Sequence, residues 1–531
     1  MNKYPYLLCL VILIMVSVAS AQERKGLIPL KAAIHISSSV SDGEYSLVQI
    51  AQAARDSGIS VIAFTDRDHM RWEYGLWPLR NLIRKTVEDN SISTFGIQRY
   101  LKEIHELQNT FTDIILIPGV EAAPFYYWEG SPFKSILLLG RQLLYYKNGE
   151  YRDIRTEMTE KLRLGREHVS AAVESKRMRL YNWHVHMLGI GLNNYRDFNE
   201  LPVIGNPGGV RGKFSILSLW PLIILVLGLW GCKVSFYRYT DQSGRHIGIY
   251  SKKRFILSTA AVLISIPFVL DNPTFSSLKF DQYHGDQKNL PYQNYIDYIN
   301  EKGGLVFWAH PEVENTERIG DIDVITRKYI QRLLDTKDYA GFSILPEGSP
   351  EMIRVGGIWD NVLFDYCRGL RQKPVWAIGG LAFDRGDLVS SMKNWQTVIL
   401  VSAKTRNAVL DALKKGKMYV VGGENSLDFC LDEFSISDQR GDARGDMGET
   451  VPIINAPVIH LKGGFLSSQR EVEVSIIREG EIVQTYKTET PFSIEYSGDG
   501  LPKGKSYYRV RIQGKGLNVI ANPIFVTCSR K

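Results

Sequence analysis

Two stretches near the N-terminus decide which fold the sequence predicts: "AIHISSSVSDG" (residues 33–43) and "VIAFTDRDH" (residues 61–69). Each begins as a short apolar strand and ends in polar residues. Between them, "SLVQIAQAARDSG" has the apolar spacing of a helix that stops at a glycine. A strand, a helix and a second strand predict a βαβ unit with parallel strands.

The same alternation recurs along most of the chain. Apolar runs such as 305–311 predict strands, and residues 75–89 and 96–111 have the apolar spacing of helices. We therefore expect one α/β domain, a barrel or an open sheet, made of residues 30–205 and 285–425.

The C-terminal part has a different pattern. Residues 426–531 alternate apolar and polar positions between turn signals such as "REGE" and "SGDGLPKG". This pattern predicts a small all-β sandwich. It contains no group of residues that predicts catalysis.

Two apolar runs, 214–231 and 255–270, interrupt the α/β pattern. As helices they would span about 27 Å and about 24 Å, close to a hydrocarbon core of about 30 Å. The loop between them, residues 232–254, holds six Lys or Arg and one acid, as the positive-inside rule expects of a cytoplasmic loop. We predict a transmembrane hairpin; the alternative is a pair of buried core helices.

The N-terminus predicts export. Lys3 precedes an apolar run and the sequence Ala-Ser-Ala, so residues 1–21 are predicted to be a signal peptide, with an uncleaved anchor as the alternative. Export and the hairpin would place the barrel and the β domain on the extracytoplasmic side of a cell membrane. The net charge of +7 is not concentrated in a basic tract, so we expect no nucleic-acid partner.

Residue types that bind metals stand at the ends of the predicted strands. In a parallel barrel these ends meet at one face, where ligands bind. Imidazole and carboxylate groups gathered there would suit a divalent transition metal such as zinc, manganese or iron. The candidates are His35, Asp42, Arg67, His69, Glu121, His184, His186, His310 and Asp384.

Several candidates also have a purely structural interpretation. His35 is equally consistent with a buried core histidine, Asp42 with a turn residue, and His310 with a strand cap. Glu121 is harder to explain this way, because a carboxylate at a strand end needs a partner.

Six motifs follow one another along the chain: "IHISSSVSDG", "FTDRD", "LIPGVEA", "HMLGIGL", "LVFWAHPE" and "AIGGLAFD". Their order resembles that of the PHP (polymerase and histidinol phosphatase) superfamily. The resemblance implies a distorted (βα)7 barrel, here interrupted by the transmembrane hairpin and followed by the β sandwich. It also implies up to three bound metals and hydrolysis of phosphoesters, or of carbamate esters in a branch similar to carbaryl hydrolases.

The sequence departs from the family pattern at three motifs. Where the family has His-x-His, Thr-Asp-His and Asp-x-His, this chain has His35-Ile36-Ser37, Thr65-Asp66-Arg67 and Ala382-Phe383-Asp384. By that pattern Ser37 and Ala382 remove half of a first metal site, which would otherwise use His35 and Glu121.

A second site, of Glu121, His186 and His310, is intact by the same pattern. Ser135, in "SILLLG" (135–140), is a competing match for the position given to His186. We prefer His186, because it keeps a metal ligand.

The third site would consist of Asp42, Arg67 and Asp384. A guanidinium is repelled by a metal cation, but between two carboxylates it can take the place of one. We therefore hypothesise that Arg67 replaces the third metal and bridges Asp42 and Asp384.

Two functions follow. The first is a membrane-anchored extracytoplasmic hydrolase with one or two metal ions, acting on phosphoesters or related esters of a small molecule or a glycan. Arg67 would stabilise negative charge, and Asp384 or His69 would be the general base. The second is an inactive binding or scaffold protein, which need hold no metal. The oligomeric state is left open.

Overall fold

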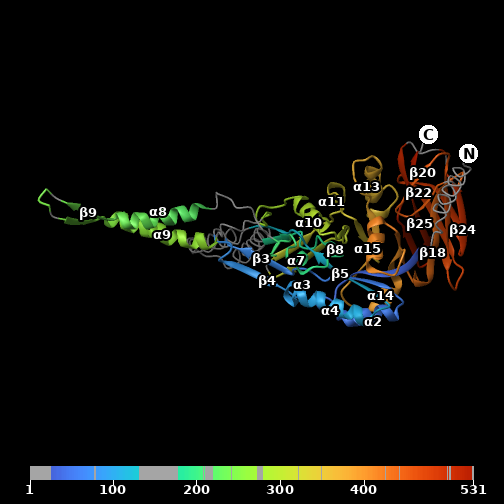
Figure 1. Cartoon of the computed structure of the whole chain (residues 1–531), viewed down its shortest axis with the longest axis horizontal. Helices are drawn as coiled ribbons and strands as arrows, with labels where there is room; N and C mark the ends of the chain where they lie inside the picture. Colours follow the sequence, from blue (N-terminus) through green and yellow to red (C-terminus); the bar gives the residue numbers. More distant parts are fainter. Residues whose placement is uncertain are drawn as a thin grey trace, which may run out of the picture.

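The computed structural model describes residues 26–528, except 77–78, 131–177, 207, 210–218, 241, 245, 272–278, 321, 349, 425, 442, 499 and 501–503. The predicted signal peptide, residues 1–21, and Ser135 lie outside the described residues. The described elements form a barrel, a β sandwich beside it and a projecting pair of helices (Figure 1).

Seven strands close into the barrel, because the last of them pairs with the first. Six run in one direction and β8 runs against its two neighbours. The predicted α/β barrel is therefore confirmed. In chain order the strands are β1 (Ile28–Ile36), β2 (Val61–Phe64), β5 (Ile115–Ala122), β8 (Met187–Ile190), β11 (Leu305–Trp308), β14 (Gly341–Ile344) and β15 (Trp376–Phe383).

Amphipathic helices cover the outside of the barrel. In α2 the buried residues include Leu47, Ile50 and Ala54, which are spaced for one helix face. The helix begins with a capping box between Ser46 and Gln49. The longer barrel helices are α2 (Leu47–Asp56), α4 (Ile97–Thr110), α10 (Leu290–Glu301), α13 (Ile358–Cys367), α14 (Leu388–Asn394) and α15 (Arg406–Lys415).

The helix predicted at 75–89 is wrong. Strands β3 (Arg71–Gly75) and β4 (Arg84–Glu88) form a hairpin there, with Trp72 opposite Val87. Trp72 is buried and packs edge-on against Trp128. Packing of the aromatic side chain outweighs the weak helical pattern, as is common for β-forming segments.

A four-stranded sheet stands beside the barrel, in the order β12 (Asn315–Ile319), β13 (Ile322–Thr326), β7 (Met178–Tyr181) and β6 (Tyr127–Glu129). It is tied to the chain entering β8, because the amide of His184 donates to the Thr326 hydroxyl at 3.1 Å. This contact fixes the segment that carries His186.

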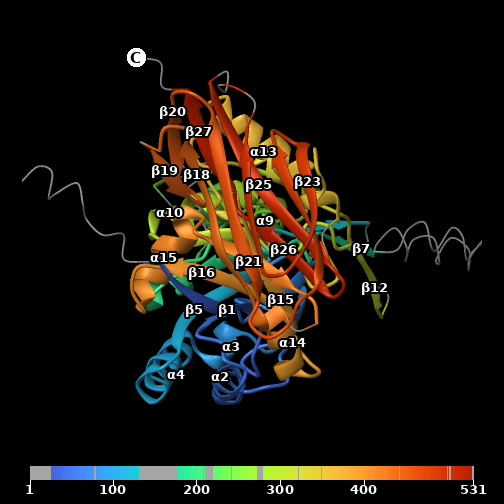
Figure 2. The same cartoon turned by 90° about the vertical axis from the view of Figure 1, so that its right-hand side faces the viewer.

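The β sandwich shares a sheet with the barrel. β16 (Trp395–Val401) pairs with β1, and β17 (Met418–Gly422) continues the sheet to β26 (Leu517–Ala521), β25 (Lys505–Gly514), β22 (Glu471–Arg478) and β23 (Glu481–Glu489). The second layer has the order β19 (Arg444–Asp446), β18 (Phe429–Asp438), β21 (Pro457–Phe465) and β24 (Phe492–Ser497). Strands β20 (Thr450–Ile453) and β27 (Ile524–Cys528) pair beside β25. Figure 2 shows the sandwich face-on.

A buried ion pair joins the sandwich to the barrel. Arg509 on β25 donates two hydrogen bonds to Asp360 on α13, from Nε to Oδ1 at 2.7 Å and from Nη2 to Oδ2 at 2.6 Å. The Tyr507 hydroxyl donates to the same carboxylate at 2.9 Å, and the Gly356 amide at 2.8 Å. The two parts are therefore held in one orientation by a bidentate pair.

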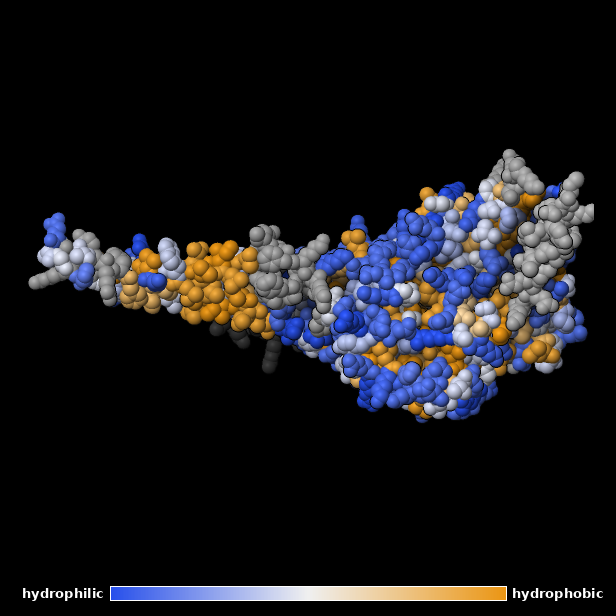
Figure 3. Space-filling view, in the orientation of Figure 1, coloured by the Kyte–Doolittle hydropathy of each residue, from blue (hydrophilic) through white to orange (hydrophobic). Residues whose placement is uncertain are grey.

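Helices α8 (Trp220–Val234) and α9 (Lys252–Asp271) pack against each other and project far from the barrel (Figure 1). A short hairpin of β9 (Phe236–Thr240) and β10 (His246–Tyr250) joins their outer ends. The surface of the pair is largely apolar (Figure 3), with Leu227, Trp230 and Leu257 among the exposed residues.

Of the described helices, α9 is long and apolar enough to cross a membrane, whereas α8 is apolar but shorter. Part of the predicted span 214–231, residues 214–218, lies outside the described residues.

Candidate metal centre

The polar ends of the barrel strands converge at one face. Glu121 lies on β5, His310 follows β11, and His35 lies near the end of β1. His186 precedes β8, and because β8 runs in the opposite direction its beginning lies where its neighbours end. Four candidates from distant parts of the sequence are thus brought together.

A β-bulge directs His35 into this cluster. Ile34 and Ile36 pair with Ala63 and Phe64, which are consecutive on β2, so His35 is the extra residue of β1. Its φ of 67° lies in the left-handed region, which costs a non-glycine residue about 1–2 kcal/mol. Strain of this kind is often found at functional sites.

Three imidazoles surround one oxygen of Glu121. Its Oε1 lies 2.7 Å from Nδ1 of His186, 3.3 Å from Nε2 of His35 and 3.5 Å from Nε2 of His310. The carboxylate is 3% exposed, yet its Oε1 has no hydrogen-bond partner in the part of the chain that the structure describes. A buried carboxylate oxygen facing several imidazole nitrogens is a donor set that suits a divalent metal.

The charges of the cluster depend on burial. Burial by itself would raise the pKa of Glu121, but the charge of Arg67 and the nearby His186 and His35 lower it well below its usual value. Burial lowers the pKa of His310, and that of His186 to about 3. An ionised carboxylate with neutral imidazoles is the protonation state that a metal site requires.

Arg67 lies directly beside Glu121. The two residues form an isolated parallel β-bridge, so their side chains leave the same face of the sheet. Nε of Arg67 donates to Oδ2 of Asp42 at 2.7 Å, and Nη1 lies 3.9 Å from Oε2 of Glu121. Burial would lower the pKa of Arg67, but Glu121, Asp42 and Asp384 raise it.

The prediction that Arg67 bridges Asp42 and Asp384 is therefore right for Asp42 and wrong for Asp384. Asp42 contacts Arg67, but Asp384 is 44% exposed and its carboxylate pairs with Arg385 at 3.5 Å. Among the described residues, Glu121 is the second acid paired with Arg67. Asp384 influences the guanidinium only through its charge.

His69 faces a small cavity at the centre. The cavity measures about 10 Å³, room for about one water molecule, and its lining includes Arg67, Asp68, Glu121 and His186. Burial lowers the pKa of His69. His184 instead turns toward Glu317, with Nε2 3.0 Å from Oε1, and so is not part of the cluster.

Asp68 was not among the sequence candidates. It is buried, its Oδ2 has no hydrogen-bond partner among the described residues, and burial raises its pKa to about 7. In "TDRDH" (65–69) Asp68 stands two residues after Asp66. This spacing is the sequence signal that could have added Asp68 to the candidate site residues. A carboxyl group with a pKa near neutrality suits proton transfer.

Asp66 has a structural role instead. Its carboxylate accepts from the amide of Ser38 at 2.6 Å and from the hydroxyls of Ser38 and Ser41 at 2.9 Å and 2.8 Å. Burial raises the pKa of Asp66 to about 6. These bonds hold the 37–43 turn, and therefore Asp42, close to Arg67.

Ser37 and Ala382, which stand where the family has metal ligands, place no ligand atom in the cluster around Glu121. Ser37 is buried, and its amide donates to the carbonyl of Phe383 at 3.0 Å. Ala382 is exposed, and its φ of 45° is left-handed. The centre is therefore His35, Glu121, His186 and His310, with Arg67 as a fixed positive charge.

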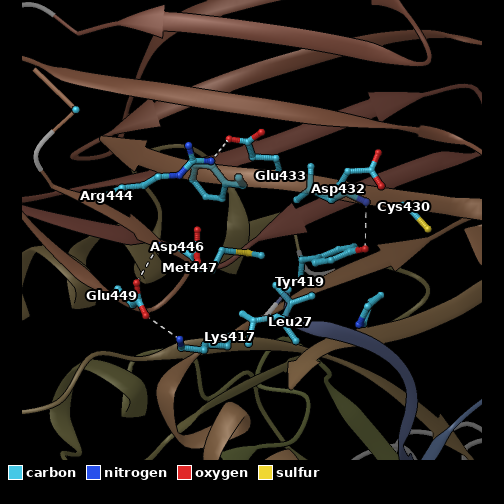
Figure 4. Close-up of a pocket in the computed structure, with 16 residues that line it drawn as sticks. Leu27, Lys417, Tyr419, Cys430, Asp432, Glu433, Arg444, Asp446, Met447 and Glu449 are labelled. Carbon is cyan, nitrogen blue, oxygen red and sulfur yellow. Dashed lines mark hydrogen bonds and ion pairs between the residues drawn. The ribbon is translucent and has the colours of Figure 1, made fainter. Parts of the chain in front are cut away.

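A second hollow lies between the barrel edge and the sandwich, with a volume of about 1010 Å³. Four of its charged residues form pairs: Lys417 with Glu449 at 2.7 Å, and Arg444 with Glu433 (Figure 4). This pairing gives no cluster of ligands like that around Glu121.

The sequence matches the family model of the PHP domain over residues 33–154. No curated protein matches it significantly. Among solved structures, it is similar to a two-domain protein from Bacteroides vulgatus containing a predicted PHP-like metal-dependent phosphoesterase, at 10% identity and a TM-score of 0.32, covering 93% of this chain and 95% of that one.

Two further structures are similar over about two thirds of the chain. One is an amidohydrolase from Chromobacterium violaceum with bound sulfate and no metal, at 12% identity and a TM-score of 0.26, covering 66% of this chain and 87% of that one. The other is a putative metal-dependent phosphoesterase from Bifidobacterium adolescentis, at 14% identity and a TM-score of 0.26, covering 67% and 87%. TM-scores this low do not establish a common fold, so the likeness rests on the family model: residues 33–154 match the PHP domain.

Proposed function

We propose that this protein is a membrane-anchored, metal-dependent phosphoesterase with a reduced metal centre. The observation that carries the proposal is the convergence of His35, His186 and His310 on the buried Oε1 of Glu121 beside Arg67. A divalent metal bound there would lower the pKa of a water molecule and stabilise charge on a phosphoryl oxygen.

The residues of the chain would share the remaining work. Arg67 is held by Asp42 and is 20% exposed, so part of its guanidinium can reach an anionic substrate. Arg67 would orient the phosphoryl group and stabilise the charge that develops on it. Asp68 faces the same cavity and has a pKa of about 7, so we propose it as the general base, in preference to Asp384 or His69.

The helix pair α8 and α9 supports membrane anchoring. At 1.5 Å per residue the 20 residues of α9 are about 30 Å long, the thickness of a hydrocarbon core. Lys233, Lys252, Lys253 and Arg254 are exposed at the outer ends of the two helices. By the positive-inside rule this end would face the cytoplasm, and the barrel would face the other side of the membrane.

The function is tested with full-length protein in detergent, loaded with zinc or manganese and assayed on p-nitrophenyl phosphate and bis-p-nitrophenyl phosphate. His310→Ala should abolish hydrolysis, and addition of a chelator to the wild type should do the same. His284→Ala is the matched control, because the His284 side chain is 74% exposed and pairs with Asp281.

Equal activity in wild type and His310→Ala would contradict the catalytic site. A wild-type protein that binds metal but hydrolyses nothing would favour the binding or scaffold function, which Ser37 and Ala382 also favour. The topology has a separate test: a reporter fused within residues 232–254 should report the cytoplasm.

A further inference from the structure

His186 differs from the other two imidazoles in its distance to Glu121. Two ligand atoms that each lie about 2.1 Å from one tetrahedral ion are about 3.4 Å apart. The nitrogens of His35 and His310 match this separation, at 3.3 Å and 3.5 Å from Oε1. Nδ1 of His186 lies at 2.7 Å, which is closer than two ligands of one tetrahedral ion and typical of a direct polar contact.

Arg67 determines which nitrogen of His186 carries the proton. Nη1 of Arg67 lies 2.9 Å from Nε2 of His186 and 3.3 Å from Nδ1. A guanidinium only donates hydrogen bonds, so the nearer nitrogen must accept. A proton on both nitrogens would place two cations in contact; the ring is therefore neutral, with its proton on Nδ1.

The proton on Nδ1 faces the metal centre. The protonated Nδ1 of His186 lies 2.7 Å from Oε1 of Glu121 and 3.1 Å from Nε2 of His310. A nitrogen that carries a proton has no lone pair to offer a metal. Nδ1 of His310 lies instead 3.2 Å from the Tyr329 hydroxyl, which leaves Nε2 of His310 free to bind a metal, in the usual arrangement of a ligating histidine.

We propose that the metal is held by His35, Glu121 and His310, and that His186 is a positioning residue which Arg67 keeps out of the ligand set. Arg67 thus has two effects: it supplies a positive charge and it fixes the tautomer of His186. The inference rests on the metal centre of the proposed function but not on its substrate. A centre with three protein ligands keeps coordination positions open for water and substrate.

The test is the zinc affinity of full-length protein, measured by competition with a chromophoric chelator. Asparagine replaces each histidine, because its amide can still donate near the position of Nδ1. His186→Asn should keep zinc affinity within about threefold of wild type, whereas His310→Asn and His35→Asn should lose more than about 100-fold, beyond the effect of an outer-shell change. His184→Asn is the matched control, because His184 bonds to Glu317 outside the cluster.

Arg67→Met provides the second arm. Without the guanidinium, Nε2 of His186 can take the proton, and Nδ1 can move away from Oε1 of Glu121 to bind the metal as a fourth ligand. Zinc affinity should then rise about tenfold, and the rise should vanish in Arg67→Met combined with His186→Asn, as a double-mutant cycle would detect. Unchanged thermal unfolding of the metal-free variants excludes misfolding as the cause.

Equal losses in His186→Asn and His310→Asn would overturn the inference, as would the lack of an affinity gain that depends on His186. Neither result depends on hydrolysis. A protein that binds zinc as expected but hydrolyses no phosphoester would therefore contradict the proposed function and leave this inference standing. A protein that binds no zinc would overturn both.

Discussion

Arg509 and Arg67 both pair with carboxylates, and the two pairs differ in their geometry and exposure. Arg509 is 1% exposed and meets Asp360 in a bidentate pair at 2.7 Å and 2.6 Å, supported by Tyr507. Arg67 is 20% exposed, contacts Asp42 through one nitrogen, and lies 3.9 Å from Glu121. The Arg509–Asp360 pair is fully buried, whereas part of the Arg67 guanidinium remains accessible to solvent or a ligand.

The difference separates a structural role from a functional one. A buried bidentate pair resists disruption, because removing one partner leaves an unpaired charge in a dry environment. A guanidinium held at one end and facing a cavity can bind an anion without rearranging the protein. Arg509 should therefore matter most for stability, and Arg67 most for activity.

The largest effect is expected from Arg509→Met. Asp360 would remain buried without its partner, so the free energy of unfolding should fall by about 3–5 kcal/mol. Urea unfolding followed by fluorescence measures this loss. The double variant Arg509→Met with Asp360→Leu should recover much of it, because neither charge then remains buried.

If Arg509→Met unfolds at the same urea concentration as the wild type, the Arg509–Asp360 pair does not hold the barrel and the sandwich together. The comparison between the two arginines would then fail on its structural side. A similar loss in both the single and the double variant would point to lost packing around Arg509 rather than to the unpaired carboxylate.

The second effect is expected from Arg67→Lys. Lysine keeps the charge but cannot hold Asp42 with one nitrogen while presenting others to His186 and a substrate. On the proposed function, kcat/KM for phosphoester hydrolysis should fall by about 10–100-fold, within the range for loss of a donor that stabilises the transition state. The free energy of unfolding should change by less than about 1 kcal/mol, because the residue is partly exposed.

Steady-state kinetics and urea unfolding of the same Arg67→Lys preparation separate the two readouts. A large loss of stability with unchanged kinetics would make Arg67 a second structural arginine. Both readouts are needed, because a fall in activity alone would also follow from partial unfolding.

Much of the fold was predictable from local pattern. Strands such as 305–311 and the helix at 96–111 have strong apolar periodicity, and the structure agrees with both. The hairpin at 71–88 was not predictable, because Trp72 and Trp128 bury one another and no local pattern records a contact between residues so far apart. The sharing of one sheet by barrel and sandwich depends likewise on the distant pairing of β17 with β26.

The site was predictable in its residue types but not in its contacts. The order of motifs pointed to His35, Glu121, His186 and His310, and the geometry shows that the sites predicted as separate share one cluster. The β-bulge that turns His35 inward has no signal in the sequence. The pairing of Arg67 with Glu121 rather than Asp384 depends on a single β-bridge, which only the three-dimensional arrangement reveals.

The smallest effect is expected from Asp42→Asn, which tests how firmly Asp42 holds Arg67. Asp42 and Arg67 are 28% and 20% exposed, so their pair should contribute only about 0–1 kcal/mol to stability. Asparagine can still accept from Nε of Arg67 but no longer offsets its charge, so kcat/KM should fall only about threefold, the effect of weakening rather than losing a contact. A stability loss as large as that of Arg509→Met would show that the Arg67–Asp42 pair stabilises the fold as strongly as the Arg509–Asp360 pair does. The functional difference between the two arginines would then have to come from the histidines around Glu121 alone.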